Sequence, residues 1–178
     1  MAAPHNPKRY GETWPDDKIQ ACLEELMHIR PWVILSGGWA WHFMSPPGHK
    51  ELKHAHDHKD IDIFVRPDNV ATVMSFLLER GFQKVRTRYD GLKNNNDFRR
   101  YEKVVDNYRV TIDFFVDADI PILNIDGWII VEPKHLLSLY SSIHSSEACF
   151  AVQAASRLIK EGKNPVYSEE LVQIPEKE

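Results

Sequence analysis

Three aspartates lie in or next to apolar segments, where a carboxylate is unfavourable unless it has a partner or a function. Asp60 and Asp62 border the short apolar run 61–65, and Asp113 lies within the apolar run 110–116. Strand residues two apart point to the same face, so we expect Asp60 and Asp62 to face one way. A buried acid needs a partner, which favours Asp113 beside them on a neighbouring strand. Such carboxylates repel unless a cation lies between them, and Mg²⁺ takes oxygen ligands of this kind. The alternative is that the acids lie at strand edges in water.

A glycine-rich turn precedes the aspartate pair. The apolar run 33–35 ends in Ser36-Gly37-Gly38, and an apolar, aromatic segment follows. This pattern predicts a strand, a tight turn and the start of a helix. Glycines let the backbone approach a ligand closely, and amide groups at a helix N-terminus favour an anion. The turn is therefore a candidate phosphate cradle, with the Ser36 hydroxyl as a further contact, or else a simple connection.

Histidines gather in the polar segment 49–59, which contains four of the nine in the chain. His54 to His58 resembles the His-x-His-x-Asp-His zinc motif of metallo-hydrolases but is one residue short. We therefore favour adventitious metal binding over a catalytic zinc. His58 and Lys59 stand immediately before the aspartate pair, and Lys59 is a candidate phosphate contact. For His58, a site role and a solvated loop position both remain open.

Taken in order, these motifs resemble the nucleotidyltransferase superfamily, which has the fold of DNA polymerase beta. The nearest likeness is to the aminoglycoside and lincosamide nucleotidyltransferases, whose signature is Gly-Gly-Trp followed by His-x-Asp-x-Asp. Here Gly37-Gly38-Trp39 and the segment 58–62 match this signature, and Asp113 matches a later strand aspartate. The resemblance covers residues 32–116. Relatives often carry an arginine two residues before the motif histidine, where this chain has His56, so the phosphate clamp would come from elsewhere.

The resemblance implies an enzyme that moves a nucleoside monophosphate from a nucleoside triphosphate to a small-molecule hydroxyl and releases pyrophosphate. ATP is the expected nucleotide. Two Mg²⁺ ions are implied, bridged by Asp60 and Asp62, with Asp113 completing the acceptor-side ion and serving as general base. The implied nucleotide-binding residues are Ser36, Gly37, Gly38, His58 and Lys59.

Two other functions stay open. The first is a toxin-like transferase of the same fold that modifies RNA or protein; a basic groove beside the aspartates would favour it. The second is a non-catalytic binding module with this fold, against which the complete set of three aspartates counts. Many relatives bind the acceptor with a second domain or subunit, so a homodimer is a further prediction. Solution mass tests it.

The elements that must position these residues follow from the apolar periodicity. The order predicts an α+β fold, with a mixed sheet, helices mainly on one face and a C-terminal helical part. Arg99, Arg100 and Lys103 are interpreted as a solvated strand face. The expected domain is 14–164, with its core at 32–131 and C-terminal helices within 133–162, between a leader (1–13) and a tail (165–178). The expected strands are 32–35, 60–65, 82–88, 98–105, 108–116 and one or two within 120–131; the expected helices are 16–30, 39–44, 66–81, 133–140 and 148–160.

Composition is typical of a globular protein. The 178 residues are 43% hydrophobic and 27% charged, and the formal net charge is −4. That charge argues against strong non-specific binding to nucleic acid, although a local basic patch stays possible. No apolar run reaches the length of a membrane span. Cys22 and Cys149 both fall in helical patterns, which favours free thiols and a cytoplasmic location over a disulfide framework.

Overall fold

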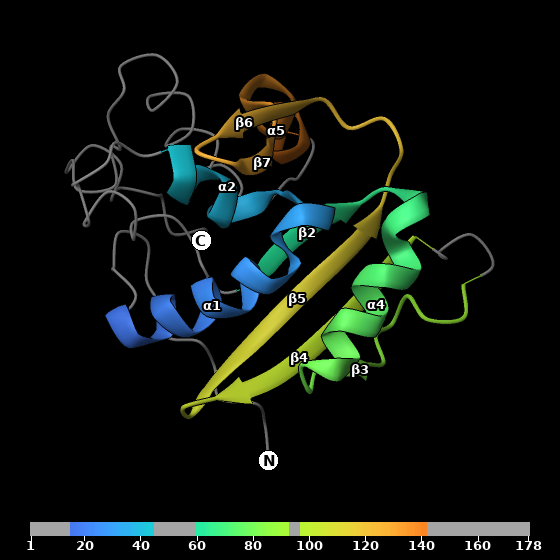
Figure 1. Ribbon diagram of the computed structural model, residues 1–178. Helices are drawn as coiled ribbons and strands as arrows, with labels where there is room; N and C mark the ends of the chain where they lie inside the picture. The colour runs from blue at the N-terminus through green and yellow to red at the C-terminus, as the bar shows by residue number, and fades with distance from the viewer. Residues whose placement is uncertain (1–14, 45–59, 93–96, 142–178) are drawn as a thin grey trace, which may run out of the picture.

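The computed structural model describes residues 15–44, 60–92 and 97–141 (Figure 1). These residues form one mixed sheet with α-helices and short 3-10 turns around it. The strands are β1 (Ile34–Leu35), β2 (Ile61–Val65), β3 (Gln83–Val85), β4 (Phe98–Val105), β5 (Tyr108–Val116), β6 (Ile122–Ile125) and β7 (Trp128–Val131). The helices are α1 (Asp16–Ile29), α2 (Gly37–Met44), α4 (Val70–Glu79) and α5 (Pro133–Ser141), with 3-10 turns η1 (Arg30–Trp32) and η2 (Pro67–Asn69).

The sheet has seven strands in the order β3-β4-β5-β2-β1-β7-β6. The β2–β5 and β1–β7 pairs are parallel, and the other neighbouring pairs are antiparallel. This is the predicted mixed sheet of an α+β fold, and it places β2 and β5 at its centre.

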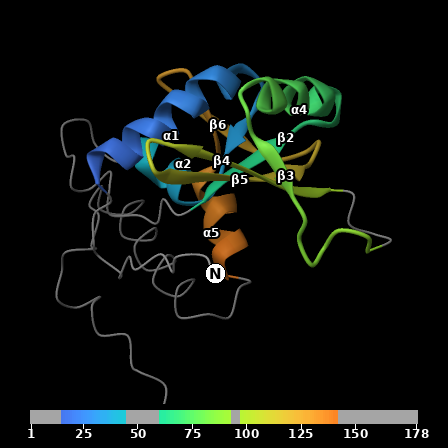
Figure 2. The same ribbon diagram turned by 90° about the horizontal axis from the view of Figure 1, so that it is seen from below.

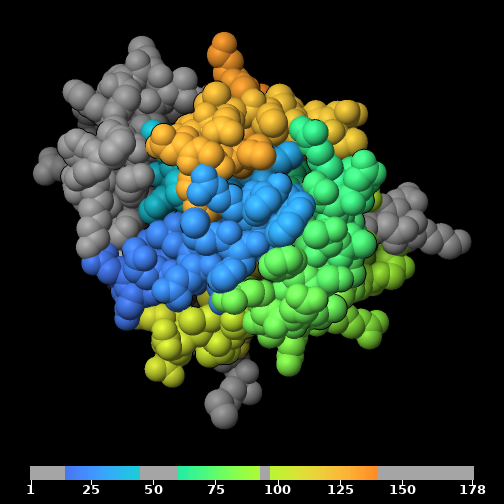
Figure 3. All heavy atoms as spheres, in the orientation of Figure 1, coloured from blue at the N-terminus to red at the C-terminus, as the bar shows by residue number. Residues whose placement is uncertain are grey.

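The two long helices cover one face of the sheet. Figure 2 shows α1 and α4 together on one side and α5 on the other, and in Figure 3 the side chains of α1 and α4 form a continuous surface. The core between these helices and the sheet holds the alternate strand residues. Members with at most 1% exposure include Ile19, Leu26, Ile61, Ile63, Leu77, Tyr101, Ile112 and Phe114. The opposite face of β2, β5 and β4 therefore carries the remaining side chains of those strands.

Local signals explain the start of α1 and the end of α4. Asp16 and Asp17 occupy the first turn of α1, where acids suit the helix dipole. At the end of α4, Gly81 has a φ of +86°. Its N–H donates to the Leu78 carbonyl, and the Phe82 N–H donates to the Leu77 carbonyl. This is the Schellman arrangement that glycine makes possible.

Two predicted strands are shorter than expected. The predicted strand 32–35 begins only at Ile34, because Pro31 helps to set a 3-10 turn over Arg30–Trp32. The predicted strand 82–88 is confined to Gln83–Val85. There Asp90 accepts hydrogen bonds from the Thr87 N–H and hydroxyl, which turns the chain away from the sheet.

Two predicted helices have other bounds: the helix predicted over 66–81 is a 3-10 turn at Pro67–Asn69 followed by α4 at Val70–Glu79, and the helix predicted over 39–44 begins two residues earlier, at Gly37. The hairpin has the predicted bounds 98–105 and 108–116, and the region 120–131 forms two strands. The predicted leader, the tail and the helix 148–160 lie outside the described residues, and the domain limits remain a prediction. None of the described helices combines the length and apolar character that a membrane crossing requires.

Candidate active site

Asp62 and Asp113 lie directly opposite each other at the centre of the sheet. Parallel pairing of β2 with β5 sets Asp62 against Asp113, with Ile61 against Ile112 and Ile63 against Phe114. Because those apolar neighbours fill the core under α1 and α4, strand alternation turns both carboxylates to the other face. Asp113 is 7% exposed as a residue, and Asp60, two residues before Asp62, comes just before the start of β2.

A third charged side chain extends this row. Antiparallel pairing of β4 with β5 sets Arg100 against Asp113. Arg100 Nε donates to Asp113 Oδ1 over 2.6 Å, and Nη2 donates to Oδ2 over 2.7 Å. Nη2 also lies 3.6 Å from Oδ2 of Asp60. We call Asp62, Asp113 and Arg100 the charged row; with Asp60 they bring together residues from three neighbouring strands.

The prediction of a solvated strand face was wrong for Arg100 and for Lys103. Arg100 makes a bidentate ion pair with Asp113. Its hydrogen bonds to that carboxylate raise the pKa of the guanidinium above its usual, already high value. Lys103, on the other face, donates to the carboxylate of Glu25 in α1. The signal for Arg100 was present: a two-residue turn at 106–107 pairs 105 with 108 and therefore 100 with 113.

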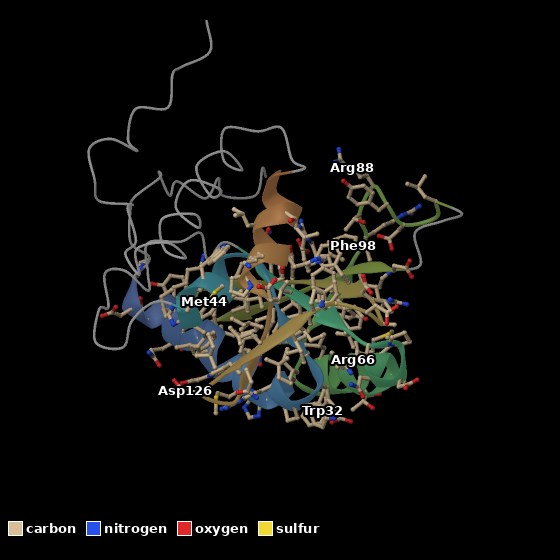
Figure 4. The ribbon with its side chains drawn as sticks, turned by 90° about the horizontal axis from the view of Figure 1, so that it is seen from above. Trp32, Met44, Arg66, Arg88, Phe98 and Asp126 are labelled. Atoms are coloured by element: carbon tan, nitrogen blue, oxygen red, sulfur yellow. The ribbon has the colours of Figure 1, made fainter. Side chains whose placement is uncertain are left out.

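Aromatic side chains form a second row beside the charged row. Phe64 and Phe115 lie opposite each other, as do Phe115 and Phe98. Their ring centroids are 5.4 Å and 5.1 Å apart, and Tyr89 meets Phe98 edge-on at 5.7 Å. In Figure 4, Phe98 and Arg88 lie on the side of the sheet that carries α5, whereas Trp32 lies on the opposite side. Aromatic side chains therefore line one side of the charged row.

The glycine turn touches Asp62. Gly37 has a φ of +59°, and a Cβ placed on it would overlap Oδ2 of Asp62. Ser36 is buried; its N–H donates to the Asp62 carbonyl over 2.9 Å, and its own carbonyl accepts the Ala40 N–H over 3.2 Å. The turn thus ends β1, begins α2 and lies against Asp62. Glycine is needed at position 37 for both its backbone angle and its missing side chain.

The carboxylate oxygens of the three aspartates are of the right kind to bind a hard divalent cation. Their arrangement meets the needs of such an ion only in part. Carboxylate oxygens from Asp60 and Asp62 are the ligands that Mg²⁺ takes. Both oxygens of Asp113 accept hydrogen bonds from Arg100. Within residues 15–44, 60–92 and 97–141, no three His, Cys, Asp or Glu side chains are grouped closely enough to hold a metal ion. The chemistry of the carboxylates therefore suits Mg²⁺, but the described side chains are not gathered into a metal site, and Asp113 is held by Arg100.

The remaining predicted site residues divide into two groups. Gly38 is buried in the first turn of α2, next to Gly37. His58 and Lys59 lie outside the described residues, so their roles stay predictions. The structure thus brings together Ser36, Gly37, Asp60, Asp62 and Asp113 from the predicted set, and adds Arg100.

Comparison with known proteins supports the fold. No model of a protein family matches the sequence, and no protein of curated function matches it. Among solved structures, the chain is similar to the lincosamide antibiotic adenylyltransferase LnuA in its lincomycin-bound crystal structure. The TM-score is 0.50 at 12% sequence identity, covering 82% of this chain and 98% of that one. At this identity the likeness establishes a nucleotidyltransferase-like fold.

Proposed function

We propose that this protein is a Mg²⁺-dependent nucleotidyltransferase. It would move a nucleoside monophosphate, with ATP as the expected donor, to a hydroxyl of a small molecule and release pyrophosphate. The observation that carries the proposal is the contact between the Gly37 turn and Asp62, with Asp113 directly opposite on β5. The turn that would bind phosphate, two acids that would hold a metal ion and a further acid are thus neighbours, on a fold similar to that of an adenylyltransferase.

The two glycines and the three aspartates each have a role in this proposal. The backbone N–H groups of Gly37 and Gly38 face the triphosphate at the start of α2, where the helix dipole favours negative charge. Asp60 and Asp62 would hold a Mg²⁺ ion, which would neutralise phosphate charge. Asp113 accepts the proton of the acceptor hydroxyl as the oxygen bonds to the α-phosphorus. The bond from the α-phosphorus to the bridging oxygen breaks, and pyrophosphate leaves with that electron pair.

The small-molecule acceptor is the finer part of the proposal. LnuA is an antibiotic adenylyltransferase whose structure holds lincomycin, so lincomycin and aminoglycosides are the first acceptors to test. His58 and Lys59 remain candidate nucleotide contacts. A homodimer that completes the site also remains a prediction, and sedimentation would test it against the 20.7 kDa chain mass.

One observation favours a second candidate function. Arg100 already engages both oxygens of Asp113, as would suit a binding module that keeps the fold without turnover. The two candidates differ in whether pyrophosphate is released, since a binding module would bind a ligand and release none.

Thermal unfolding with each of four nucleoside triphosphates, with and without Mg²⁺, tests the nucleotide site. A ligand at a hundredfold excess over its Kd stabilises the native state by about 2.7 kcal/mol. We expect an upward Tm shift that needs Mg²⁺ and is lost in Asp62→Asn. Asp68→Asn, an exposed aspartate in η2, is the matched control and should keep the shift.

Acceptor screening follows with pyrophosphate release as the readout. Release that depends on a hydroxyl acceptor and is abolished in Asp62→Asn supports the enzyme. A Mg²⁺-dependent shift without pyrophosphate release from any acceptor would favour the binding module. No shift with any of the four nucleotides would contradict the transferase and favour the non-catalytic binding module or a site that a partner completes.

A further inference from the structure

Arg100 is held in place from one edge of its guanidinium group. Nε and Nη2 donate to the two oxygens of Asp113 over 2.6 Å and 2.7 Å, and Asp113 is itself buried on the neighbouring strand β5. A bidentate pair of this kind fixes the plane of the guanidinium as well as its position. The Arg100 side chain is still 34% exposed. Its position is therefore fixed while part of it stays open to a ligand.

The opposite edge of the same guanidinium has donors left over. An arginine has five N–H donors, and the pair with Asp113 uses two of them. Nη1 has no acceptor among residues 15–44, 60–92 and 97–141. Nη2 lies 3.6 Å from Oδ2 of Asp60, which is beyond hydrogen-bond distance. The edge formed by Nη1 and the second N–H of Nη2 is therefore available to a ligand oxygen beside Asp60.

This free edge lies where the proposed reaction brings a phosphate group. Asp113 is the proposed base for the hydroxyl that attacks the α-phosphorus, and Arg100 is anchored on Asp113. Asp62 lies directly opposite Asp113 and touches the Gly37 turn, which is the proposed cradle for the triphosphate. The planar N–H donors of an arginine match the oxygens of a phosphate. Phosphate is therefore the ligand group that this edge fits.

We propose that Arg100 is a substrate-binding residue whose free edge donates to a non-bridging oxygen of the α-phosphate. This inference rests on the proposed function, because the nucleotide comes from that site. The contact holds the phosphate that is transferred and neutralises charge on its oxygens as the bond to the acceptor oxygen forms. Asp113 then has two tasks. It anchors Arg100, and the lone pairs that Arg100 does not use remain for the acceptor hydroxyl.

The dissociation constant of MgATP, measured on the full chain by titration calorimetry, tests this contact without turnover. We expect Arg100→Met to weaken binding at least about tenfold, since hydrogen bonds to a charged group are lost. Arg100→Lys keeps the charge but not the planar edge and should weaken binding severalfold. Arg109→Met is the matched control. It removes an arginine from the same face of the sheet, 3.9 Å from Glu102, and should leave the dissociation constant unchanged.

A second variant separates the contact from the charge of Asp113. Removing Arg100 leaves that carboxylate without its counter-charge, which by itself repels a triphosphate. The double variant Arg100→Met with Asp113→Asn removes both charges of the pair. We expect it to stay at least about tenfold weaker than the wild type, and recovery of wild-type affinity would overturn the proposal. Circular dichroism checks that each variant is folded.

The α-thio analogue of ATP places the contact on the α-phosphate. Its two diastereomers replace one or the other non-bridging oxygen with sulfur, which is a weaker hydrogen-bond acceptor. Arg100→Met should cost less affinity with one diastereomer than with ATP, because sulfur has already weakened the contact, and should keep its full cost with the other. An equal cost with both diastereomers would overturn the assignment to the α-phosphate.

These outcomes are separate from those of the proposed transferase. MgATP binding that depends on Arg100, without pyrophosphate release from any acceptor, would support the contact and contradict the transfer reaction. Pyrophosphate release by the wild type, with MgATP affinity and turnover unchanged in Arg100→Met, would support the transferase and overturn the contact. The absence of binding with all four triphosphates would contradict both.

Discussion

Gly37 and Asp62 meet where β1 turns into α2, and this contact makes a prediction at the scale of a single residue. Gly37→Ala adds a Cβ that overlaps the Asp62 carboxylate, and it strains a backbone with φ of +59°. We expect a loss of about 2–4 kcal/mol of unfolding free energy, because strain of about 1 kcal/mol adds to the displacement of a packed carboxylate. The Mg²⁺-dependent nucleotide shift should disappear as well.

Gly91 provides the matched control for this substitution. It has a φ of +90°, but a Cβ there would meet nothing within 4 Å. Gly91→Ala should therefore cost only the backbone strain, about 1 kcal/mol, and should keep the nucleotide shift. Chemical denaturation gives both free energies. Equal costs for the two alanine variants would contradict the packing of Asp62 against Gly37.

Cys22 makes a second prediction at this scale. Its side chain is 2% exposed, and burial raises the pKa of its thiol to about 11. About one thiol in a thousand is then ionised at pH 8, and the thiolate is the reactive form. In Cys149→Ser, where Cys22 is the remaining thiol, we expect no reaction with Ellman's reagent in the native state and full reaction in guanidinium. Fast reaction of the native protein would contradict this burial.

At the scale of elements, the ion pairs of Glu25 connect α1 to α4 and β4. Glu25 accepts from Arg80 Nε and Nη2 at 3.0 Å and 3.2 Å, and from Lys103 Nζ at 2.6 Å. Burial alone would raise the pKa of Glu25, but the hydrogen bonds from Arg80 and Lys103 outweigh it and lower the pKa below its usual value. The carboxylate is therefore more stable in the folded protein than in the unfolded chain.

Glu25→Gln tests this connection through its pH dependence. Because the folded pKa is lowered, the stabilisation is complete above the unfolded pKa, near pH 4.5, and is lost as pH falls through the folded pKa. We expect Glu25→Gln to cost about 2 kcal/mol at pH 7, less than a fully buried pair would, since Arg80 and Lys103 are partly exposed to solvent. That difference should shrink below about pH 4.

Glu24→Gln is the control for the pH series. Glu24 is exposed on the same helix, so its replacement should change the unfolding free energy by less than about 0.5 kcal/mol. A gap between wild type and Glu25→Gln that stays constant from pH 7 to pH 3 would contradict the lowered pKa.

The β4–β5 hairpin shows how far the sequence predicts an element. Asp106 and Asn107 form a two-residue turn with φ of 47° and 69°, residue types that tolerate this conformation. The strand bounds were predicted correctly from the apolar pattern around them. The register then follows by counting, so the Arg100–Asp113 pair was predictable in principle. The pair was missed because Arg99, Arg100 and Lys103 were assigned together to one solvated face of β4. Arg100 lies on the opposite face of that strand from the other two.

At the scale of the whole molecule, the sequence predicts the class of fold and a set of candidate site residues. It does not predict which of those residues contact one another. The alternation around Asp113 indicates an acid on the far side of a core strand, and the structure places it there. The order of seven strands depends on pairings such as Leu35 with Ile130, for which no local pattern gives a signal. The contact between Gly37 and Asp62 depends on the same long-range packing, so only the residue types were predictable.

The hairpin also has a consequence for the order in which the chain folds. Arg100 and Asp113 are 13 residues apart across a tight turn, whereas Asp62 is 51 positions before its partner Asp113 and Leu35 is 95 positions before Ile130. Closing a short loop costs less entropy and takes less time than joining distant segments. We therefore expect the hairpin to form first, with Asp113 already neutralised by Arg100 when β2 arrives. Asp62 would then dock beside a neutral pair instead of a bare carboxylate, which lowers the electrostatic cost of joining β2 to β5.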